Sequence, residues 1–249
     1  MKYSIVEEED YVKIDNRFIL WNTFAYDKKH KILFIADTHI GLEEYYRQQG
    51  TFIPRILLKD LKEKTLNALK KFDVKKIILL GDVKHEFGTI SKQEWFETKE
   101  FFKIIKDYEI ILIKGNHDTI LKPISEKFQF LLTEVYNYDD VLVLHGDKEF
   151  NVDKKIKYIL LGHEHPAISL RRFTRVEKFK CFLLGEYKKK KLLVLPSSHI
   201  ITEGTDVLKE NLLSPLIKNL ENFEVIIVAD KLYYFGKIKD ILELLKEFN

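Results

Sequence analysis

The sequence has few of the features that mark several other classes of protein. Among its 249 residues there is a single cysteine, Cys181, so the chain cannot form an internal disulfide. Proteins without disulfides are typical of reducing compartments, and we expect a cytoplasmic location. No motif surrounds Cys181, which favours a buried structural thiol over a catalytic one.

Long apolar runs and a large net charge are also absent. No apolar stretch reaches the roughly 18 residues that a membrane span needs, so we expect no membrane association through such a span. The 42 basic and 39 acidic residues leave a formal net charge of +3, which neither indicates nor excludes a nucleic-acid partner. The chain is 45% hydrophobic and 33% charged, a composition typical of globular proteins with a sizeable core.

Apolar runs of strand length alternate with helix-like segments in the first half of the chain. The pattern predicts strands at 3–6, 11–20, 31–36, 76–80 and 109–114. It predicts one helix over 54–72, with Ile56, Leu57, Leu61, Leu66 and Leu69 on its apolar side. A second helix is expected over 91–106, where Ser91 and Glu94 form a capping box. This alternation indicates parallel strands that are joined by crossover helices.

In the second half, strands follow one another. After a segment that is ambiguous between helix and strand, 123–138, we expect strands at 141–144, 157–161, 167–173, 180–187 and 191–196. A short helix should start at Ser214, followed by a hairpin over 225–235 and an amphipathic helix over 237–248. Consecutive strands imply antiparallel pairing and a second sheet. The expected organisation is a single domain over 1–249, with a motif core over 31–200 and a C-terminal strand and helix extension over 205–249.

The segment 112–118, Leu-Ile-Lys-Gly-Asn-His-Asp, concentrates polar chemistry at the end of an expected strand. Gly115 would let the backbone turn and approach a ligand closely. Open α/β sheets place their sites at such carboxyl ends. Four other expected strands end in a similar way, in Asp-Thr-His, Gly-Asp, His-Gly-Asp and Gly-His-Glu-His.

The polar residues at these strand ends suggest a metal site. They are Asp37, His39, Asp82, Asn116, His117, His145, His163 and His165. One such histidine would more simply be a core or surface residue, but five of the eight histidines of the chain fall at these positions. Imidazole, carboxylate and amide ligands without thiolate favour Mn²⁺, Fe²⁺ or Zn²⁺. The number of candidate ligands suits two ions that share a carboxylate.

The motifs DTHIG, GDVKH, GNHD, HGD and GHEH, in this order, resemble those of the calcineurin-like metallophosphoesterases. Within that superfamily the chain is most similar to the small phosphoesterases related to SbcD-type repair nucleases. The resemblance implies a four-layer α/β/β/α sandwich of two mixed β-sheets flanked by helices. It also implies two divalent ions, with Mn²⁺ expected and Fe²⁺, Zn²⁺ or Ni²⁺ as alternatives. The implied ligands are Asp37, His39 and His165 for the first ion, Asp82 as the bridge, and Asn116, His145 and His163 for the second ion.

The same resemblance implies hydrolysis of a phosphoester by a hydroxide that bridges the two ions. His117 would protonate the leaving oxygen, a role typically worth ~10² to 10⁴-fold in rate, and Asp118 would orient His117 through a hydrogen bond. His85 could bind the phosphate or only stabilise its loop. Glu164 should point away from the ions, toward surrounding polar groups or solvent.

The expected function is therefore a phosphodiesterase that acts on a nucleotide or a nucleic acid. The length of the chain leaves little room for the DNA-binding extensions of larger repair nucleases, which favours small diesters or short single strands. The alternatives are a phosphomonoesterase and a catalytically silent metal-binding scaffold, although every motif position is filled. The terminal segment 225–248 could pack on the core or form a homodimer contact.

Overall fold

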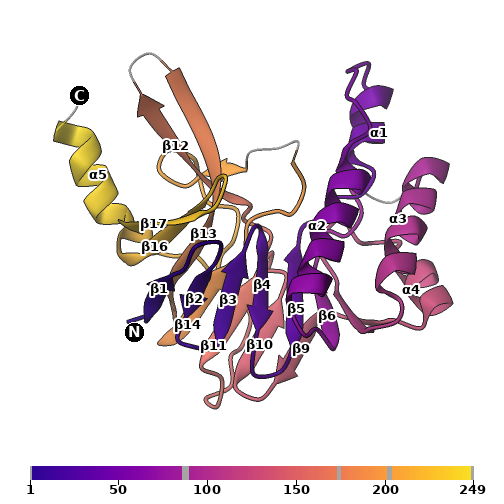
Figure 1. The fold of residues 1–249 in the computed structure, drawn as a ribbon, viewed down its shortest axis with the longest axis horizontal. Helices are drawn as coiled ribbons and strands as arrows, with labels where there is room; N and C mark the ends of the chain where they lie inside the picture. The colour runs from indigo at the N-terminus through magenta and orange to yellow at the C-terminus, as the bar shows by residue number, and fades with distance from the viewer. Residues whose placement is uncertain (1, 86–89, 173–174, 201–203, 248–249) are drawn as a thin grey trace.

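Two mixed β-sheets pack face to face in the computed structural model, with helices on their outer sides (Figure 1). The structure describes residues 2–85, 90–172, 175–200 and 204–247. The α/β fold expected from the sequence, a sandwich of two mixed sheets flanked by helices, is confirmed.

The first sheet has eight strands in the order in which they occur in the chain. They are β1 (Ile5–Glu7), β2 (Val12–Ile14), β3 (Phe18–Trp21), β4 (Phe24–Asp27), β5 (Ile32–Ala36), β6 (Lys76–Leu80), β7 (Glu109–Ile113) and β8 (Leu131–Thr133). The strands up to β5 are antiparallel, and β5 to β8 are parallel. The parallel half is the part in which the sequence alternates between strands and helices, so its carboxyl ends lie at one edge.

The second sheet forms from the later strands. They are β9 (Val135–Tyr138), β10 (Val141–Leu144), β11 (Tyr158–Leu161), β12 (Pro166–Arg172), β13 (Arg175–Tyr187), β14 (Lys190–Val194), β15 (Thr205–Asp206), β16 (Glu224–Val228) and β17 (Leu232–Lys237). β10, β11 and β14 are parallel neighbours. The hairpin of β12 and β13 projects beyond the sandwich (Figure 1), and β16 joins the sheet through β13.

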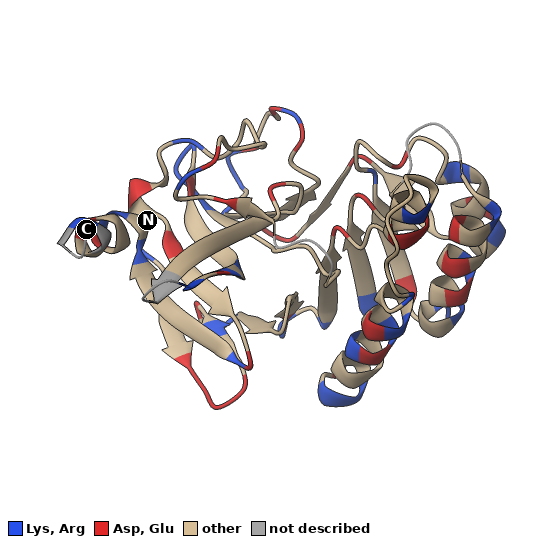
Figure 2. Cartoon of the chain, turned by 90° about the horizontal axis from the view of Figure 1, so that it is seen from above, with Lys and Arg blue, Asp and Glu red and all other residues tan. Residues whose placement is uncertain are grey.

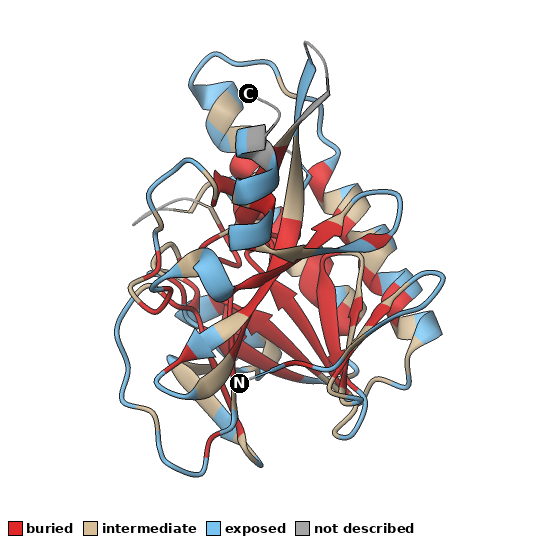
Figure 3. Ribbon diagram, turned by 90° about the vertical axis from the view of Figure 1, so that its left-hand side faces the viewer, coloured by how far each residue is buried: buried red, intermediate tan, exposed pale blue. Residues whose placement is uncertain are grey.

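Alternate residues of the strands face opposite layers, as the pleat of a β-strand requires. Phe34, Ile78 and Ile111 pack between the sheets, together with Leu160 and Leu193 from the second sheet. The side chains one position along in β5 to β7 face the helices instead. Figure 3 shows that the strands are mostly buried, whereas the last helix is largely exposed.

The outer face of the first sheet is covered by α2 (Leu57–Lys71), α3 (Lys92–Ile105) and α4 (Lys122–Phe128). In the view from above, Lys, Arg, Asp and Glu residues lie along these helices (Figure 2). The outer face of the second sheet packs against α5 (Ile238–Glu247) and the loops before it. Within the described residues, none of the helices is long and apolar enough to cross a membrane.

Several local expectations were wrong. The segment 11–20 is two strands, because Asp15 and Asn16 adopt positive φ and turn the chain between β2 and β3. β4 and the short helix α1 (Leu42–Gln48) were not expected. In α2, Leu66 is exposed, and the buried side instead includes Thr65.

The ambiguous segment 123–138 resolves into α4, β8 and β9. No helix starts at Ser214, whose hydroxyl donates to the carbonyl oxygen of Gly146 at 2.6 Å; a single 3₁₀ turn follows at Leu220–Asn222. β13 begins before the expected position 180. Phe173 and Phe248, the expected ends of two elements, lie outside the described residues. The single-domain organisation stays a prediction.

Candidate metal centre

The polar residues of the five motifs meet at one edge of the sandwich. Asp37 and Asp82 follow β5 and β6, parallel neighbours in the first sheet. His145 and His163 follow β10 and β11, parallel neighbours in the second sheet. Because the two sheets are stacked with these carboxyl ends on the same side, residues more than 100 positions apart come into contact. His163, for example, donates its backbone N–H to Asp37 at 2.9 Å.

A first group consists of Asp37, His39, Asp82 and His165, whose ligand atoms lie within 4.8 Å of one another. The Nε2 atoms of His39 and His165 are 3.2 Å apart. His165 Nε2 is 3.5 Å from Asp37 Oδ2, and His39 Nε2 is 3.7 Å from Asp82 Oδ2. These four residues are the expected ligands of the first ion together with the expected bridge.

A second group consists of Asp82, His145 and His163. His145 Nε2 lies 3.4 Å from Asp82 Oδ2 and 3.2 Å from His163 Nδ1. The amide oxygen of Asn116 is 3.0 Å from the same nitrogen of His145. The structure therefore brings all seven expected ligands together, and Asp82 belongs to both groups.

Three glycines of the motifs have no side chain where the expected ligands approach their backbone. A Cβ atom at Gly81 would lie 2.1 Å from the ring of His145, and one at Gly115 would lie 2.2 Å from Asp82 Oδ1. A Cβ atom at Gly162 would lie 2.6 Å from Asp37 Oδ2. Each distance is well inside van der Waals contact, so a side chain at any of these positions would clash with an expected ligand from the next strand or from the other sheet.

The backbone is strained at five of the expected ligands. Asp37, His39, Asp82, His163 and His165 adopt φ values between 41° and 62°. Such left-handed conformations are uncommon for residues other than glycine, and they concentrate at sites where function requires them. These positions all lie within four residues after the ends of β5, β6 and β11, where the chain leaves the sheets.

His117 and His85 lie beside the first group. The ring of His117 donates from Nδ1 to the carbonyl oxygen of His85, which leaves its Nε2 facing the centre, 3.9 Å from Asp82 Oδ2. His85 Nδ1 is 3.3 Å from His39 Nδ1. The fully buried Lys84 donates from Nζ to the carbonyl oxygen of His117 at 2.8 Å. Both backbone and ring of His117 are thus held in place.

Asp118 has different partners from the expected one. We expected its carboxylate to orient the ring of His117, but its described hydrogen bonds come from the backbone amides of Val83, Lys84 and Gly115. Burial and the charge of Asp82 raise the pKa of Asp118 to about 6, although these amides oppose the shift. The carboxylate of Asp118 therefore joins the turn before His117 to the backbone of the motif that carries Asp82.

Glu164 is fully buried and points away from the two groups. Its Oε2 accepts from the backbone amides of Leu213 and Ser214 at 2.9 and 2.8 Å, so it ties the loop after β15 to the motif that carries His163 and His165. Burial raises its pKa to about 7. The expectation left open whether Glu164 faces polar groups or solvent, and the structure places it among polar backbone groups.

His199 is a residue at this edge that the motif pattern missed. It is 3% exposed, and its ring centroid lies 5.3 Å from that of His39 and 5.8 Å from that of His165. The signal was present, because His199 follows the expected strand 191–196. It was overlooked because Ser197 and Ser198 stand between the strand and His199, and serine is not among the ligand residues found at the other strand ends.

The comparisons with known proteins agree with this geometry. A family model described as calcineurin-like phosphoesterase matches residues 30–228, which is most of the chain. The chain belongs to the calcineurin-like phosphoesterase family. It is thus a member of a family of hydrolases that typically bind divalent metals. A search of curated proteins found no match.

Two solved structures are similar to this chain to different degrees. The nuclease MPE of Pseudomonas putida is similar with a TM-score of 0.66 and 19% sequence identity, over 94% of this chain and 100% of that one. The phosphoesterase Yfce of E. coli is similar with a TM-score of 0.40 and 14% identity, over 82% of this chain and 92% of that one. At 19% identity the likeness to the nuclease shows the fold alone.

The residues present fit the divalent metals that the family implies. Asp37 is fully buried, and its Oδ1 has no hydrogen-bond partner among the described residues. A buried unsatisfied carboxylate oxygen is costly, and a cation at this place would satisfy it. Burial and the neighbouring imidazoles hold the pKa of His39 well below its ordinary value, so His39 stays neutral, as a metal ligand must be.

The charge balance of the second group supports the same conclusion. Burial alone would lower the pKa of His145, but the hydrogen bond to Asp82 and the charge of Asp37 raise it to about 9. Burial opposes ionisation of Asp82, yet His145 holds the pKa of Asp82 below its ordinary value. Two buried carboxylates thus create a demand for positive charge, which a protonated imidazole can meet only in part.

A small depression opens beside the second group. It has a volume of about 230 Å³, and its lining includes Asn116, His145, Lys114, Lys148 and Phe150. Phe150 is 37% exposed, so its ring is accessible to a ligand. The depression is smaller than most pockets for drug-sized ligands, which begin near ~300 Å³.

Proposed function

We propose that the protein is a two-metal phosphodiesterase that acts on nucleotide or nucleic-acid phosphodiesters. The observation that carries the proposal is the position of Asp82, which belongs to two separate groups of ligand atoms. A carboxylate shared by two sites is the arrangement that holds two ions about 3.5 to 4 Å apart. Mn²⁺ is the ion that we expect in both positions, with Fe²⁺, Zn²⁺ or Ni²⁺ as alternatives.

The first ion would be held by Asp37, His39 and His165, and the second by Asn116, His145 and His163, with Asp82 between them. When bound, such ions stabilise the developing charge of the phosphoryl group and lower the pKa of a nearby water. The protein residues fix their positions through the strained strand ends and the glycine contacts. These ligands must be deprotonated, so binding of the ions would displace the proton that His145 otherwise holds.

His117 would supply the proton for the leaving oxygen. The carbonyl oxygen of His85 accepts from Nδ1, which fixes the ring so that Nε2 is directed at the centre. Lys84 holds the carbonyl group of His117 and Asp118 holds the preceding turn, so both would act as positioning residues. His85, which stacks on His117 with ring centroids 5.3 Å apart, would contact the phosphate.

The depression beside Asn116 and His145 supports a nucleotide as the substrate. The exposed ring of Phe150 can stack on a base, and Lys114 and Lys148 can contact flanking phosphates. Stacking on an aromatic side chain is the usual way in which proteins hold unpaired bases. The reducing cytoplasm and a homodimer stay expectations from the sequence.

A substrate panel tests the proposal. With Mn²⁺, we expect hydrolysis of bis-p-nitrophenyl phosphate and of dinucleotides to exceed that of p-nitrophenyl phosphate. His117→Ala should reduce the diester rate by ~10² to 10⁴-fold, whereas His30→Ala, which removes an imidazole outside the centre, should retain it. A preference for the monoester would instead make the protein a phosphomonoesterase. Absence of hydrolysis with every divalent metal would make it a metal-binding scaffold.

A further inference from the structure

A sixth strand end contributes to the centre. β14 is the parallel neighbour of β11, and Leu195 donates its backbone N–H to Leu161 at 2.8 Å as the two strands leave the sheet together. The chain then passes through Ser197 and Ser198 to His199. His199 therefore lies at the same edge of the sheet as His163 and His165, which follow β11, although it belongs to none of the five motifs.

The ring of His199 lies among the imidazoles of the first group. The ligand nitrogen atoms of His39, His165 and His199 are all within 4.8 Å of one another. The ring is nearly perpendicular to that of His39, with an interplanar angle of 85°, and inclined by 76° to that of His165. Three imidazoles that converge at steep angles can direct their nitrogen atoms at one point, which is the geometry of ligands around an ion.

The backbone that carries His199 is anchored on both sides. Ser198 donates its N–H at 2.9 Å to the carbonyl oxygen of Ala36, the residue before Asp37. Lys180 donates from Nζ to the carbonyl oxygen and the hydroxyl of Ser197, at 3.0 and 2.7 Å, and to the carbonyl oxygen of His199. Burial lowers the pKa of Lys180 to about 7, and its amine donates to three acceptors of one short segment.

We propose that His199 is a third imidazole ligand of the ion that is held by Asp37, His39 and His165. The inference rests on the proposed two-metal function. With Asp82, this ion would have five protein ligands, which leaves one position open in an octahedral arrangement. His199 is buried to 97%, since 3% of its surface is exposed, so it is placed for an ion inside the centre rather than for a substrate that arrives from solvent.

The additional imidazole has a consequence for metal choice. Imidazole suits Zn²⁺, Fe²⁺ and Ni²⁺ better than it suits Mn²⁺, for which oxygen ligands are preferred. Loss of His199 should therefore weaken the binding of Zn²⁺, Fe²⁺ and Ni²⁺ more than the binding of Mn²⁺. This difference separates a ligand from a residue that only fills space, because removal of a packing residue has no reason to discriminate between ions.

The test is calorimetric titration of the metal-free, full-length protein with Mn²⁺ and with Ni²⁺, without substrate. In His199→Asn, the affinity of one of the two sites should fall at least ~10-fold, because loss of even an outer contact of a ligand typically has an effect of this size. The decrease should be larger in the titration with Ni²⁺ than in the titration with Mn²⁺. The control His30→Asn should bind both ions as the wild type does. Unchanged affinities in a His199→Asn protein that unfolds at the wild-type temperature would overturn the assignment.

A second measurement covers the case in which His199→Asn does not fold. In a crystal of the wild-type protein grown with Mn²⁺, a ring nitrogen of His199 should lie about 2.0 to 2.3 Å from one ion, near the usual metal–imidazole distance. A separation above 3 Å would overturn the inference and leave the two-metal proposal intact. If the wild type bound no ion in either experiment, the proposed function itself would fail.

Discussion

The two ends of the stacked sheets carry buried polar clusters of opposite kinds. At the carboxyl ends of the parallel strands, Asp37 and Asp82 lie among imidazoles. At the amino ends, Arg17 pairs with Asp27 and Asp140. Both clusters join the first sheet to the second, and both bury carboxylates. They differ in where the compensating positive charge comes from.

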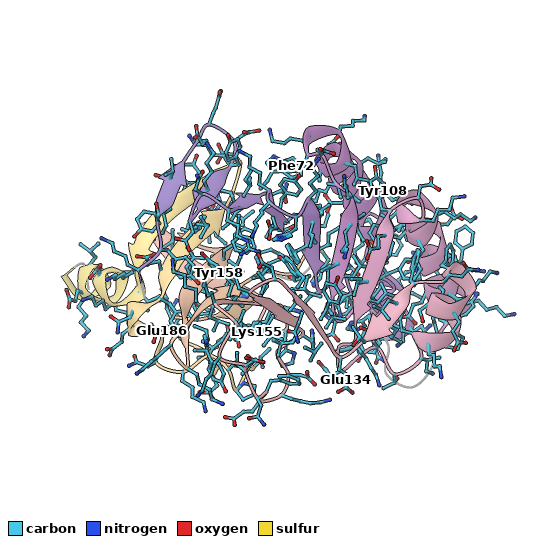
Figure 4. All side chains as sticks on the ribbon, turned by 90° about the horizontal axis from the view of Figure 1, so that it is seen from below. Phe72, Tyr108, Glu134, Lys155, Tyr158 and Glu186 are labelled. Atoms are coloured by element: carbon cyan, nitrogen blue, oxygen red, sulfur yellow. The ribbon has the colours of Figure 1, made fainter. Side chains whose placement is uncertain are left out.

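The amino-end cluster carries its own cation. Arg17 donates to Asp27 at 2.9 Å and to Asp140 at 2.5 Å, and its guanidinium group lies 5.4 Å from the ring centre of Tyr158. Tyr138 also donates to Asp27 at 2.9 Å. Figure 4, seen from below, labels Tyr158 near the middle of the molecule. Although burial opposes ionisation of Asp140, the hydrogen bond from Arg17 holds the pKa of Asp140 below its ordinary value.

The carboxyl-end cluster lacks such a partner. Within the described ranges, no Lys or Arg forms an ion pair with Asp37 or Asp82; the nitrogen atoms within 4.0 Å of their carboxylate oxygens that could carry a charge belong to histidine rings. Lys84 and Lys180 lie nearby, but their described bonds go to backbone carbonyl oxygens and one hydroxyl. The carboxylates at the amino end therefore have a cation from the protein itself, whereas those at the carboxyl end do not, and this difference is the physical basis of the metal proposal.

The largest effect should follow from removal of the shared carboxylate. Asp82→Ala should lose both ions and reduce diester hydrolysis to the background rate, because each ion loses a ligand and the charge that attracts it. His117→Ala should lose ~10² to 10⁴-fold in rate but retain the ions. Elemental analysis of both variants after dialysis checks the difference. Equal metal content in the two proteins would contradict the bridging role.

Substitutions in the amino-end cluster should lower the stability of the protein but leave its metal binding unchanged. Arg17→Ala leaves the fully buried Asp27 without its cation, and removal of one partner of a buried ion pair typically costs about 3 to 5 kcal/mol. Urea unfolding of the metal-free protein measures this loss. Lys29→Ala, which removes an exposed partner of Asp139, should change the free energy of unfolding by less than ~1 kcal/mol. A lower metal affinity in Arg17→Ala would show that the two clusters are coupled.

Glu164 should make the metal-free protein less stable as the pH rises. Its pKa is about 7 in the folded state against an ordinary value of 4.5. Between these values the folded state holds a proton that the unfolded state has released, so stability is lost as the pH increases from about 4.5 to 7. The loss should be roughly 2 to 3 kcal/mol.

Unfolding free energies at pH 5 and pH 8 for the wild type and Glu164→Gln isolate this contribution. The variant keeps an oxygen acceptor for Leu213 and Ser214 but cannot titrate. Its stability should fall by less over this range than that of the wild type. If the two proteins changed in parallel, burial of Glu164 would not be the source of the pH dependence.

The smallest effect concerns strain away from the centre. Lys188 and Lys189 adopt φ values of 47° and 60° in the turn between β13 and β14, where Asn-Gly is preferred. The double change Lys188→Asn with Lys189→Gly should raise the unfolding free energy by about 0.5 to 1 kcal/mol, because Asn and Gly adopt positive φ at a lower cost than Lys does. Thermal unfolding measures the change. A destabilisation of similar size would show that the lysines contribute more than their turn geometry indicates.

The sequence predicted the parts of the molecule that depend on local pattern. The apolar runs of β5, β6 and β7 were located within about one residue, because each run is bounded by charged residues or by a motif. Ser91 was predicted to begin α3, and its hydroxyl accepts from the backbone N–H of Glu94 at 3.0 Å. The ligands were found because they directly follow these runs.

The parts that depend on distant contacts could not be predicted. α2 begins at Leu57 rather than at Pro54, and the backbone N–H groups of Ile56 and Leu57 both donate to Glu43 in α1. A helix whose start is capped by another helix carries no local signal. His199 does follow an expected strand, but its place at the centre could not be predicted, because Lys180 and Ala36 hold its segment from elsewhere in the chain.

The central claim is that the strand ends surround a pair of cations. Anomalous diffraction from crystals grown with Mn²⁺ tests it most directly. We predict two peaks about 3.5 to 4 Å apart, with Asp82 between them, His165 beside one and His163 beside the other. A single peak, or ions bound away from Asp82, would contradict the claim.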